Sequence, residues 1–443
     1  MNSILPTIFS YSEGYNYLHR WVCSEFRLLA PEVSVLSFLD VLCRDGKTKL
    51  VNLQPSRELG IAAAKRGYVH LLEYNKEQNL PQSLCRMAAK RGHLNVLIWA
   101  KGNGFFWSEW AYVDAINNGY EEIASWALYS GCAADGSLYA AAAEHNREAI
   151  IKLAIQKEVG SDDRACKFAA KTGNLSLLMS LRWVAFPWNE KTCAEAAKRG
   201  HLEILQWAHA NGCPWDEKTC SEAARNGHLK VLQWARSANC PWNKEVCSNA
   251  AGGGHLKVLQ WARSANCPWD EDTCSEAARG GHLKVLQWAR SQGCPWNEQT
   301  CSYAASSCNL KILRWARSNG CPWSSATVYM AVRRGNLRNL KWIIEQGCDK
   351  GDYAAYFAVT GGKMKVLVYL LSLGCVLRED CLYVASRMGN LEMVKFLLRK
   401  GFVWNEDAAL YARVHERQNI LDWAKEQGLD LYPNAYESRF YSM

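Results

Sequence analysis

A repeat of 27 residues constrains this chain more than any other feature of its sequence. A glycine returns at this interval, at Gly173, Gly200, Gly227, Gly254 and Gly281. A tryptophan and a proline return in the same register. The tryptophans, here called the ladder tryptophans, are Trp207, Trp234, Trp261, Trp288, Trp315 and Trp342. The prolines are Pro187, Pro214, Pro241, Pro268, Pro295 and Pro322. About 14 repeats fit the interval from residue 53 onward, as in chains that stack identical supersecondary structures.

Each repeat has the sequence of two short helices. In the repeat that begins at Asp216, this carboxylate follows Pro-Trp and suits a helix N-cap. An Ala- and Glu-rich stretch over 217–226 predicts the first helix, and Gly227 can end it in the left-handed conformation. Apolar residues at helical spacing predict a second helix over 228–237. Since neither helix can bury its apolar face alone, the sequence predicts an all-α fold, an α-solenoid of stacked helix–turn–helix repeats.

Composition fits a folded chain in a reducing compartment. The 443 residues are 49% hydrophobic and 21% charged, so disorder is not expected. No secretory signal peptide precedes the repeats, and the apolar stretch that starts at Val366 is too short to span a bilayer. The 19 cysteines, without a secretion signal, favour reduced thiols and a cytoplasmic location. We therefore expect no membrane association.

Two series of tryptophans could either pack in the core or bind a ligand. An aromatic side chain at one fixed helical position, beside Leu and Ala, is expected to fill the joint between repeats, so the ladder tryptophans are predicted to be structural core. The second series follows the repeat prolines and is here called the connector tryptophans. Its members are Trp188, Trp215, Trp242, Trp269, Trp296 and Trp323. Two interpretations are open for them: a clamp that holds the connector on the preceding helix, or a projecting binding residue.

The cysteines and histidines do not predict chemistry. The repeat cysteines lack the short paired spacing of zinc sites, and small buried thiols explain them better. His201, His228, His255 and His282 each open a second helix, where Asn174 stands in another repeat, so a capping role is expected. No nucleophile–base pair, phosphate-binding loop or acidic pair stands out. We therefore predict a protein that is not an enzyme and has no metal or cofactor.

Basic residues just before the repeat glycine have two interpretations. Cations at a helix C-terminus offset the macrodipole, which is a purely structural role. They could also form a broken basic stripe for acidic proteins or nucleic acid. The net charge of +9 is mild for 443 residues, so nucleic acid is the less expected partner.

The repeat resembles the ankyrin repeat. Its pattern is matched by Thr219, Ala223, Ala224, Gly227, His228, Leu229 and Val231. Cys220 and Glu222 depart from the family pattern, and the repeat is about six residues shorter than the usual 33. The missing stretch falls in the connector, so the long β-hairpin fingers of the family are not expected. In ankyrin proteins the two residues before Gly-His often contact partners, which here implies Lys198, Arg199, Arg225, Asn226, Arg279, Arg333 and Arg334.

The short repeat with Cys-Pro-Trp-Asp is similar to ankyrin arrays of giant DNA viruses, in which an F-box often precedes the repeats. Residues 4–27 resemble a degenerate F-box in Leu5-Pro6, Ile8–Tyr11 and Phe26. The other interpretation is a hydrophobic cap on the first repeat. We expect three regions: an N-terminal helical cap or F-box over 1–52, the solenoid over 53–430, and a tail over 431–443.

These observations predict a non-enzymatic scaffold that binds other proteins. The resemblance of residues 4–27 to an F-box implies recruitment of the bound proteins to a ubiquitin ligase, in the host cytoplasm if the protein is viral. The alternative is a nucleic-acid-binding solenoid that uses the basic stripe.

Overall fold

The computed structural model describes residues 34–307 and 309–429. Within these ranges the chain is helical throughout, with 29 α-helices, one 3-10 helix and no strand. The α-solenoid class expected from the repeats is confirmed, and the described connectors carry no β-hairpin finger. The chain divides into two compact units, Met1–Trp215 and Asp216–Met443, which are here called unit 1 and unit 2.

Unit 1 begins, in its described part, with α4 and the 3-10 helix η2, and six helix pairs follow. The bounds are α4 Val35–Arg44, η2 Thr48–Val51, α5 Arg57–Arg66, α6 Val69–Tyr74, α7 Leu84–Ala89, α8 Leu94–Gly102, α9 Glu109–Asn117, α10 Glu121–Tyr129, α11 Gly136–Glu144, α12 Glu148–Gln156, α13 Arg164–Thr172, α14 Leu175–Trp183, α15 Glu190–Arg199 and α16 Leu202–Ala210.

Unit 2 contains eight helix pairs within its described part. The bounds are α17 Glu217–Arg225, α18 Leu229–Ser237, α19 Glu245–Gly252, α20 Leu256–Ser264, α21 Glu271–Arg279, α22 Leu283–Ser291, α23 Glu298–Ser306, α24 Leu310–Ser318, α25 Ser325–Arg334, α26 Leu337–Glu345, α27 Ala354–Thr360, α28 Met364–Ser372, α29 Cys381–Met388, α30 Leu391–Arg399, α31 Glu406–Val414 and α32 Gln418–Glu426. The two helices predicted over 217–226 and 228–237 are confirmed to within one residue at each end.

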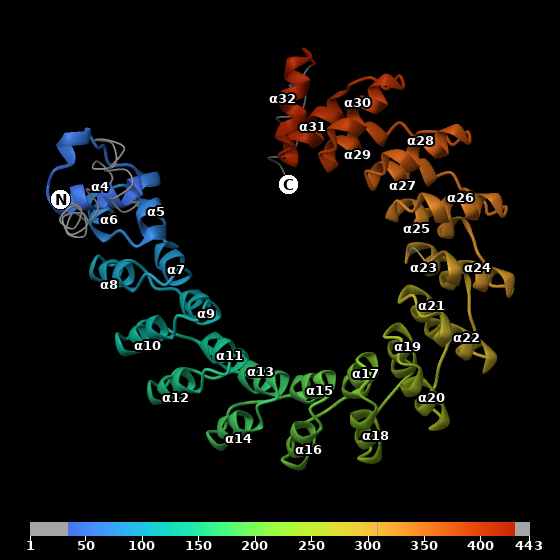
Figure 1. Cartoon of the computed structure of the whole chain (residues 1–443), viewed down its shortest axis with the longest axis horizontal. Coiled ribbons are helices and arrows are strands. Elements are labelled where there is room, and N and C mark those ends of the chain that lie inside the picture. The colour runs from blue at the N-terminus through green and yellow to red at the C-terminus, as the bar shows by residue number, and fades with distance from the viewer. Residues whose placement is uncertain (1–33, 308, 430–443) are drawn as a thin grey trace, which may run out of the picture. The chain divides into compact units, whose positions relative to one another are not determined.

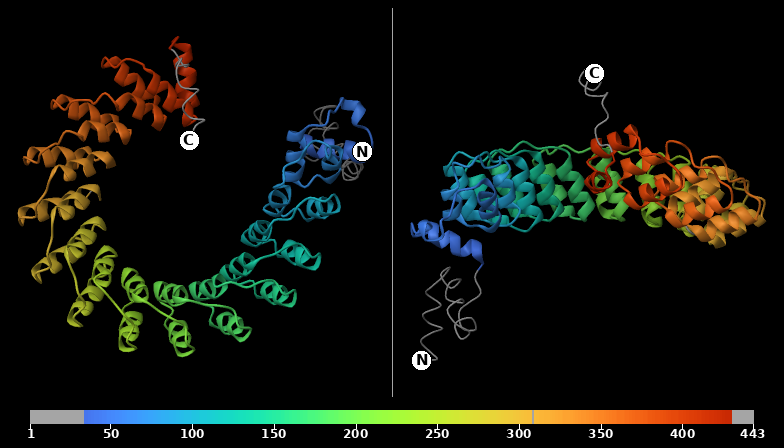
Figure 2. Two further views of the ribbon diagram at one scale, coloured as in Figure 1. Left: turned by 180° about the vertical axis from the view of Figure 1, so that it is seen from behind. Right: turned by 90° about the horizontal axis from the view of Figure 1, so that it is seen from above.

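Within each unit the odd-numbered first helices form one row and the even-numbered second helices form another (Figure 1). Successive first helices pack directly against each other, as α11 does on α13 and α23 does on α25, whereas successive second helices touch less. The left view of Figure 2 shows the same two rows from behind.

Small residues allow the close packing of the first helices. In α21, Ala277 and Ala278 are fully buried, and they face the equally small residues of the neighbouring first helices. At the end of α21, a Cβ atom on Gly280 would come within 2.4 Å of the carbonyl oxygen of Gly252 in the preceding repeat. Backbone therefore meets backbone between these repeats, and a larger side chain would separate them.

The predicted helix ends are also present. The carboxylate of Asp216 accepts a hydrogen bond from the backbone N–H of Lys218 at 3.1 Å, which caps α17. Gly227 follows that helix with a φ of +79°, in the left-handed region that favours glycine. In two other repeats Asn146 and Glu416 replace this glycine, and both residues also have a left-handed φ.

The repeat histidines do not cap the helices that they open, so that expectation was wrong. The side chains of His201, His228, His255 and His282 make no capping hydrogen bond. Instead, Nε2 of His255 donates to the carbonyl oxygen of Arg225 at 3.1 Å, and Nε2 of His282 donates to that of Gly252 at 3.1 Å. The imidazole ring is long enough to reach the last turn of the first helix in the repeat before its own. It therefore joins neighbouring repeats. Where Asn174 stands at this station, the shorter side chain caps its own helix through Leu177.

The repeat cysteines hold the end of a repeat to its start. The thiol of Cys267 donates to the carbonyl oxygen of Asn243 at 3.4 Å, and the thiol of Cys294 donates to that of Asp270 at 3.4 Å. Each acceptor lies just before the first helix of the same repeat. The cysteines of the described residues are free thiols, and most are buried. Small buried thiols, as predicted, explain the cysteine series.

At the start of the described chain, α4 covers the first helix pair. Its Phe38 and Leu42 are buried, and the carboxylate of Asp40 accepts from the backbone N–H of Leu71 in α6 at 2.7 Å. Burial raises the pKa of Asp40 above its ordinary value. This packing suits a helical cap, although the predicted boundary at residue 52 stays a prediction. The F-box-like residues 4–27 and the predicted tail over 431–443 lie outside the described residues.

Among the described helices, none is both long enough and apolar enough to cross a membrane.

Candidate functional site

The ladder tryptophans line the edge of the core. Every one of the six keeps part of its side chain exposed, whereas the fully buried positions of the second helices hold smaller residues such as Leu259 and Ala262. Trp261 packs against the connector tryptophan that directly precedes its repeat, Trp242, with ring centroids 5.8 Å apart at 62°. Equivalent edge-to-face pairs occur at Trp188–Trp207, Trp269–Trp288, Trp296–Trp315 and Trp323–Trp342. The ladder tryptophans therefore close the rim of the core, whereas smaller residues fill its centre. Their role as structural core stays a prediction.

The connector tryptophans act as clamps. The guanidinium of Arg263, at the end of the preceding second helix, stacks over Trp269 at 4.2 Å and donates to the carbonyl oxygen of Cys267. The same stacking joins Arg182, Arg236, Arg290 and Arg317 to the connector tryptophans that follow them. In unit 1 the ring of His209 takes this place on Trp215, at 3.8 Å. Of the two interpretations of these residues, the clamp is confirmed.

Unit 1 interrupts the ladder. One step of 27 residues back from Trp207 falls on Ser180 in α14, and a second step falls on Leu153 in α12. The ladder resumes at Trp126 and Trp99. A serine cannot cover the area that an indole covers in the other repeats, so the surface between these second helices is left open.

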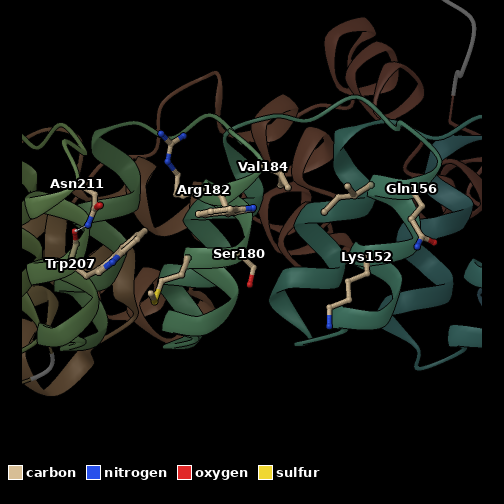
Figure 3. A pocket seen from close by; sticks show the side chains of 10 residues that line it. Lys152, Gln156, Ser180, Arg182, Val184, Trp207 and Asn211 are labelled. Carbon is tan, nitrogen blue, oxygen red and sulfur yellow. Dashed lines mark hydrogen bonds between the residues drawn. The ribbon is translucent and has the colours of Figure 1, made fainter.

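A groove of about 890 Å³ occupies this open place, between α12, α14 and α16 (Figure 3). Ser180 and Trp207 both line it. Three apolar side chains at the groove are strongly exposed: Trp183 at 91%, Met179 at 46% and Val184 at 42%. Within the described residues, the indole of Trp183 makes no hydrogen bond or ring contact. It stands at the last position of α14, where the next repeats along the chain have Ala210, Ser237 and Ser264.

Polar groups surround the apolar part of the groove. Lys152 and Gln156 extend from α12 on one side, and Asn211 lies on the other, where its Nδ2 donates to the backbone oxygen of Trp207 at 2.8 Å (Figure 3). Lys152 is exposed and, among the described residues, has no ion-pair partner. The guanidinium of Arg182 is held by Trp188 at 4.2 Å. Such a groove can accept apolar side chains of a partner and offer one ammonium group at its edge.

The predicted contact residues lie where the resemblance placed them, in the last turns of first helices, or directly after the helix in the case of Asn226. Six of the seven are exposed, and Lys198 is half-buried. Arg225 donates to the Oδ1 of Asn249 at 2.7 Å, and Arg279 pairs with Glu276 at 2.5 Å. Arg334 lines a second groove, in unit 2, together with Lys311. Lys198 and Arg199 belong to unit 1 and the other five belong to unit 2.

The described side chains do not gather into a metal-binding cluster, and their buried thiols differ in pKa. No group of three or more His, Cys, Asp or Glu that could hold a metal occurs among them. Burial raises the pKa of the Cys166 thiol to about 12, and a hydrogen bond with Cys267 together with burial raises the pKa of the Cys247 thiol. These thiols stay protonated near neutral pH, so they are poor nucleophiles.

The family of part of the chain follows from its sequence. Residues 328–407 match the family model described as "Ankyrin repeats (3 copies)". Residues 328–407 are ankyrin repeats. They span α25 to the start of α31, and their Gly335, Gly362 and Gly389 have the left-handed φ of the repeat glycines elsewhere in the chain. No protein of curated function matches the sequence.

Repeat proteins are among the solved structures that match the chain. The pentatricopeptide repeat protein PPR10 in complex with an 18-nt psaJ RNA element is 14% identical, with a TM-score of 0.38 over 89% of this chain and 68% of that chain. A further structure, PPR10 from maize, is 14% identical and has a TM-score of 0.33, over 96% of this chain and 78% of that chain. The human ASB11 ankyrin repeat domain is 14% identical and has a TM-score of 0.32, over 40% of this chain and 96% of that chain. Scores this low carry no argument about what this chain binds.

Sequence reasoning missed the groove although its signal was present. Following the ladder forward from Trp207 shows only regularity, whereas following it backward shows the substitution at Ser180. The displaced indole of Trp183, three residues later, was the second sign. Both signs become meaningful only when the stations of α14 are compared with those of the neighbouring repeats.

Proposed function

We propose that the protein is a non-enzymatic scaffold that binds other proteins, and that the groove of unit 1 is a principal contact. The single observation that supports this most is Trp183, whose indole is 91% exposed beside an open apolar groove. Exposed apolar clusters with polar rims are typical of protein–protein contacts, and tryptophan is the residue type most enriched among binding hot spots.

The chemistry of the groove favours a protein segment as its occupant. Met179, Val184 and Ile155 provide an apolar lining that an aromatic or aliphatic side chain could fill. Lys152 at the edge would pair with a carboxylate of the same segment. Ankyrin repeats are typically binding scaffolds, and repeat proteins present extended surfaces for this purpose.

The experiment compares two exposed tryptophans of unit 1. Proteins that copurify with the full chain are identified by mass spectrometry for the wild type, for Trp183→Ala and for Trp110→Ala. Trp110 is the matched control, because it is 52% exposed and lies outside the groove. We expect a specific set of proteins to be lost with Trp183→Ala and kept with Trp110→Ala. An unchanged set would eliminate the groove, and no reproducible set at all would eliminate the scaffold.

A second variant closes the groove without removing the indole. Ser180→Trp places an indole at the ladder position of α14 and should occupy the open volume of the groove. We expect this variant to fold as the wild type does by circular dichroism and to lose the same proteins as Trp183→Ala. Retention of those proteins would show that they bind elsewhere.

We also propose, on the resemblance of residues 4–27 to an F-box, that the scaffold recruits bound proteins to a ubiquitin ligase in the cytoplasm. The test is a pull-down of the full chain with the small adaptor protein that binds F-boxes, with Leu5→Ala and Pro6→Ala in one variant as the control. Binding by the wild type alone would support recruitment. Failure of the wild type to bind would leave a scaffold without this role.

A further inference from the structure

The positive charge of the chain is concentrated in unit 2. Residues 216–443 contain 29 of the 52 Lys and Arg and 22 of the 43 Asp and Glu, so unit 2 carries +7 of the net charge of +9. Between Glu298 and Glu345 the sequence has seven Lys or Arg and no Asp or Glu. The mild total charge therefore hides a strongly basic region.

A basic groove of about 710 Å³ lies in this region, between α24, α25 and α26. Four cations line it, here called the groove cations: Lys311, Arg314, Arg334 and Arg338. All four are exposed, and within the described part of the chain they form no ion pair. Asn309 and Asn336, which cap α24 and α26, also line the groove, so it faces the N-terminal ends of two helices.

Two of the groove cations belong to a longer series on the second helices. It occupies the second residue of six successive second helices and is here called the cation row: Lys230, Lys257, Lys284, Lys311, Arg338 and Lys365. All members are exposed, and none has an ion-pair partner among the described residues. The corresponding positions of unit 1 hold His70, Asn95, Glu122, Ala149, Ser176 and Glu203.

Helix stability does not explain the cation row. The first turn of a helix favours acidic residues, because its N-terminus carries a partial positive charge. Each member of the row therefore stands at a position where a cation is unfavourable. Arg225 and Arg279 differ in this respect, since they stand in last turns where the macrodipole favours them. Six unfavourable cations in succession indicate a ligand that supplies negative charge.

We infer that the cation row and the groove cations bind the phosphate backbone of a nucleic acid. A row that repeats over six helix pairs suits a partner whose charges also repeat, and nucleic acid carries a phosphate at every nucleotide. Guanidinium groups such as those of Arg314 and Arg338 match phosphate geometry. The net charge alone made nucleic acid the less expected partner, whereas the distribution of the charge favours it. This surface is independent of the unit 1 groove.

The experiment measures how salt weakens binding. Fluorescence anisotropy is recorded for the full chain with a single-stranded oligonucleotide and with a duplex of equal length, between about 50 and 200 mM salt. The test variant combines Lys230→Gln, Lys257→Gln and Lys284→Gln. Since each lost phosphate contact lowers the slope of log K against log salt by about 0.7 for a single strand and about 0.9 for a duplex, we expect losses of about 2 and about 3.

The control removes the same number of cations from unit 1. Lys65→Gln, Arg66→Gln and Lys90→Gln change three exposed residues outside the cation row, and the slope should stay at the wild-type value. An equal loss of slope in both variants would indicate nonspecific attraction and overturn the inference. Absence of binding by the wild type at the lowest salt would overturn it as well. Displacement of the oligonucleotide by a polyglutamate peptide at equal charge concentration would assign the surface to acidic proteins instead.

Discussion

Unit 1 and unit 2 are built from the same helix pair but present different surfaces. In unit 2 the ladder runs without interruption from Trp234 to Trp342, and the second helices carry the cation row. In unit 1 the ladder is broken at Leu153 and Ser180, and the exposed side chains within its described residues include five large aromatics: Phe106, Trp110, Tyr120, Tyr129 and Trp183. Unit 2 has one exposed side chain of this kind within its described residues, Tyr353.

The difference shows which stations of the repeat are fixed by packing. Stacked repeats gain stability from contacts with their nearest neighbours, so the buried Ala, Leu and Cys stations must fit in every repeat. Exposed stations contribute little to that fit, and they can diverge into an apolar surface in one unit and a basic one in the other. A ladder station is intermediate, because its ring is half-buried. Its loss opens a groove without removing the core beneath it.

We expect the largest difference in stability between a ladder tryptophan and the exposed Trp183 when each is replaced by alanine. Trp261→Ala removes a ring that packs on Trp242, so we expect it to lower the free energy of unfolding of unit 2 by about 2–3 kcal/mol. Trp183→Ala removes a ring that is 91% exposed and should stay within about 0.5 kcal/mol of the wild type. Urea unfolding followed by circular dichroism measures both. Equal losses would show that the groove of unit 1 is part of the core.

The repeat glycines give the next effect. Gly254→Ala places a Cβ on a residue at φ +77°, and that atom would lie 2.6 Å from the ring of His282, so we expect a loss of about 1–2 kcal/mol. Gly102 in unit 1 is the matched control: it is the last residue of α8 and has open space around its Cβ position. Gly102→Ala should be neutral or stabilise by up to about 1 kcal/mol. Thermal unfolding separates the two variants, and destabilisation by Gly102→Ala would contradict this account.

Helix capping gives the smallest effect. The side chain of Asn297 accepts from the backbone N–H of Gln299 at 3.0 Å, and we expect Asn297→Ala to cost about 1 kcal/mol. Ser108 opens α9 of unit 1 without a capping side-chain hydrogen bond, so Ser108→Ala should change stability by less than about 0.5 kcal/mol. The midpoint of urea unfolding provides the measurement. A larger loss for the serine variant would mean that the caps of unit 1 form differently in solution.

Much of the fold could be predicted from the sequence because the repeat multiplies weak signals. A single Asp before a helix or a single Gly after it is ambiguous, but Asp216 and Gly227 occur in a register that many repeats share. The contacts between repeats could not be predicted in the same way. The histidines were expected to cap their own helices, and the reach of His255 to Arg225 depends on how closely two repeats approach. The groove at Ser180 depends on which side chains from three helices surround it.

By itself, the sequence determined that this protein is all-α, that its repeats are helix pairs with defined caps, and that its cysteines lack the short paired spacing of zinc motifs. These features depend on local periodicity and on the chemistry of neighbouring residues. Only the tertiary structure decided that the ladder tryptophans close the rim of the core, that Trp183 stands exposed beside a groove, and that Lys311 and Arg334 line the same basic groove. The reason is physical: exposure and proximity belong to pairs of stacked helices, and the packing distance between them is set by all their side chains together.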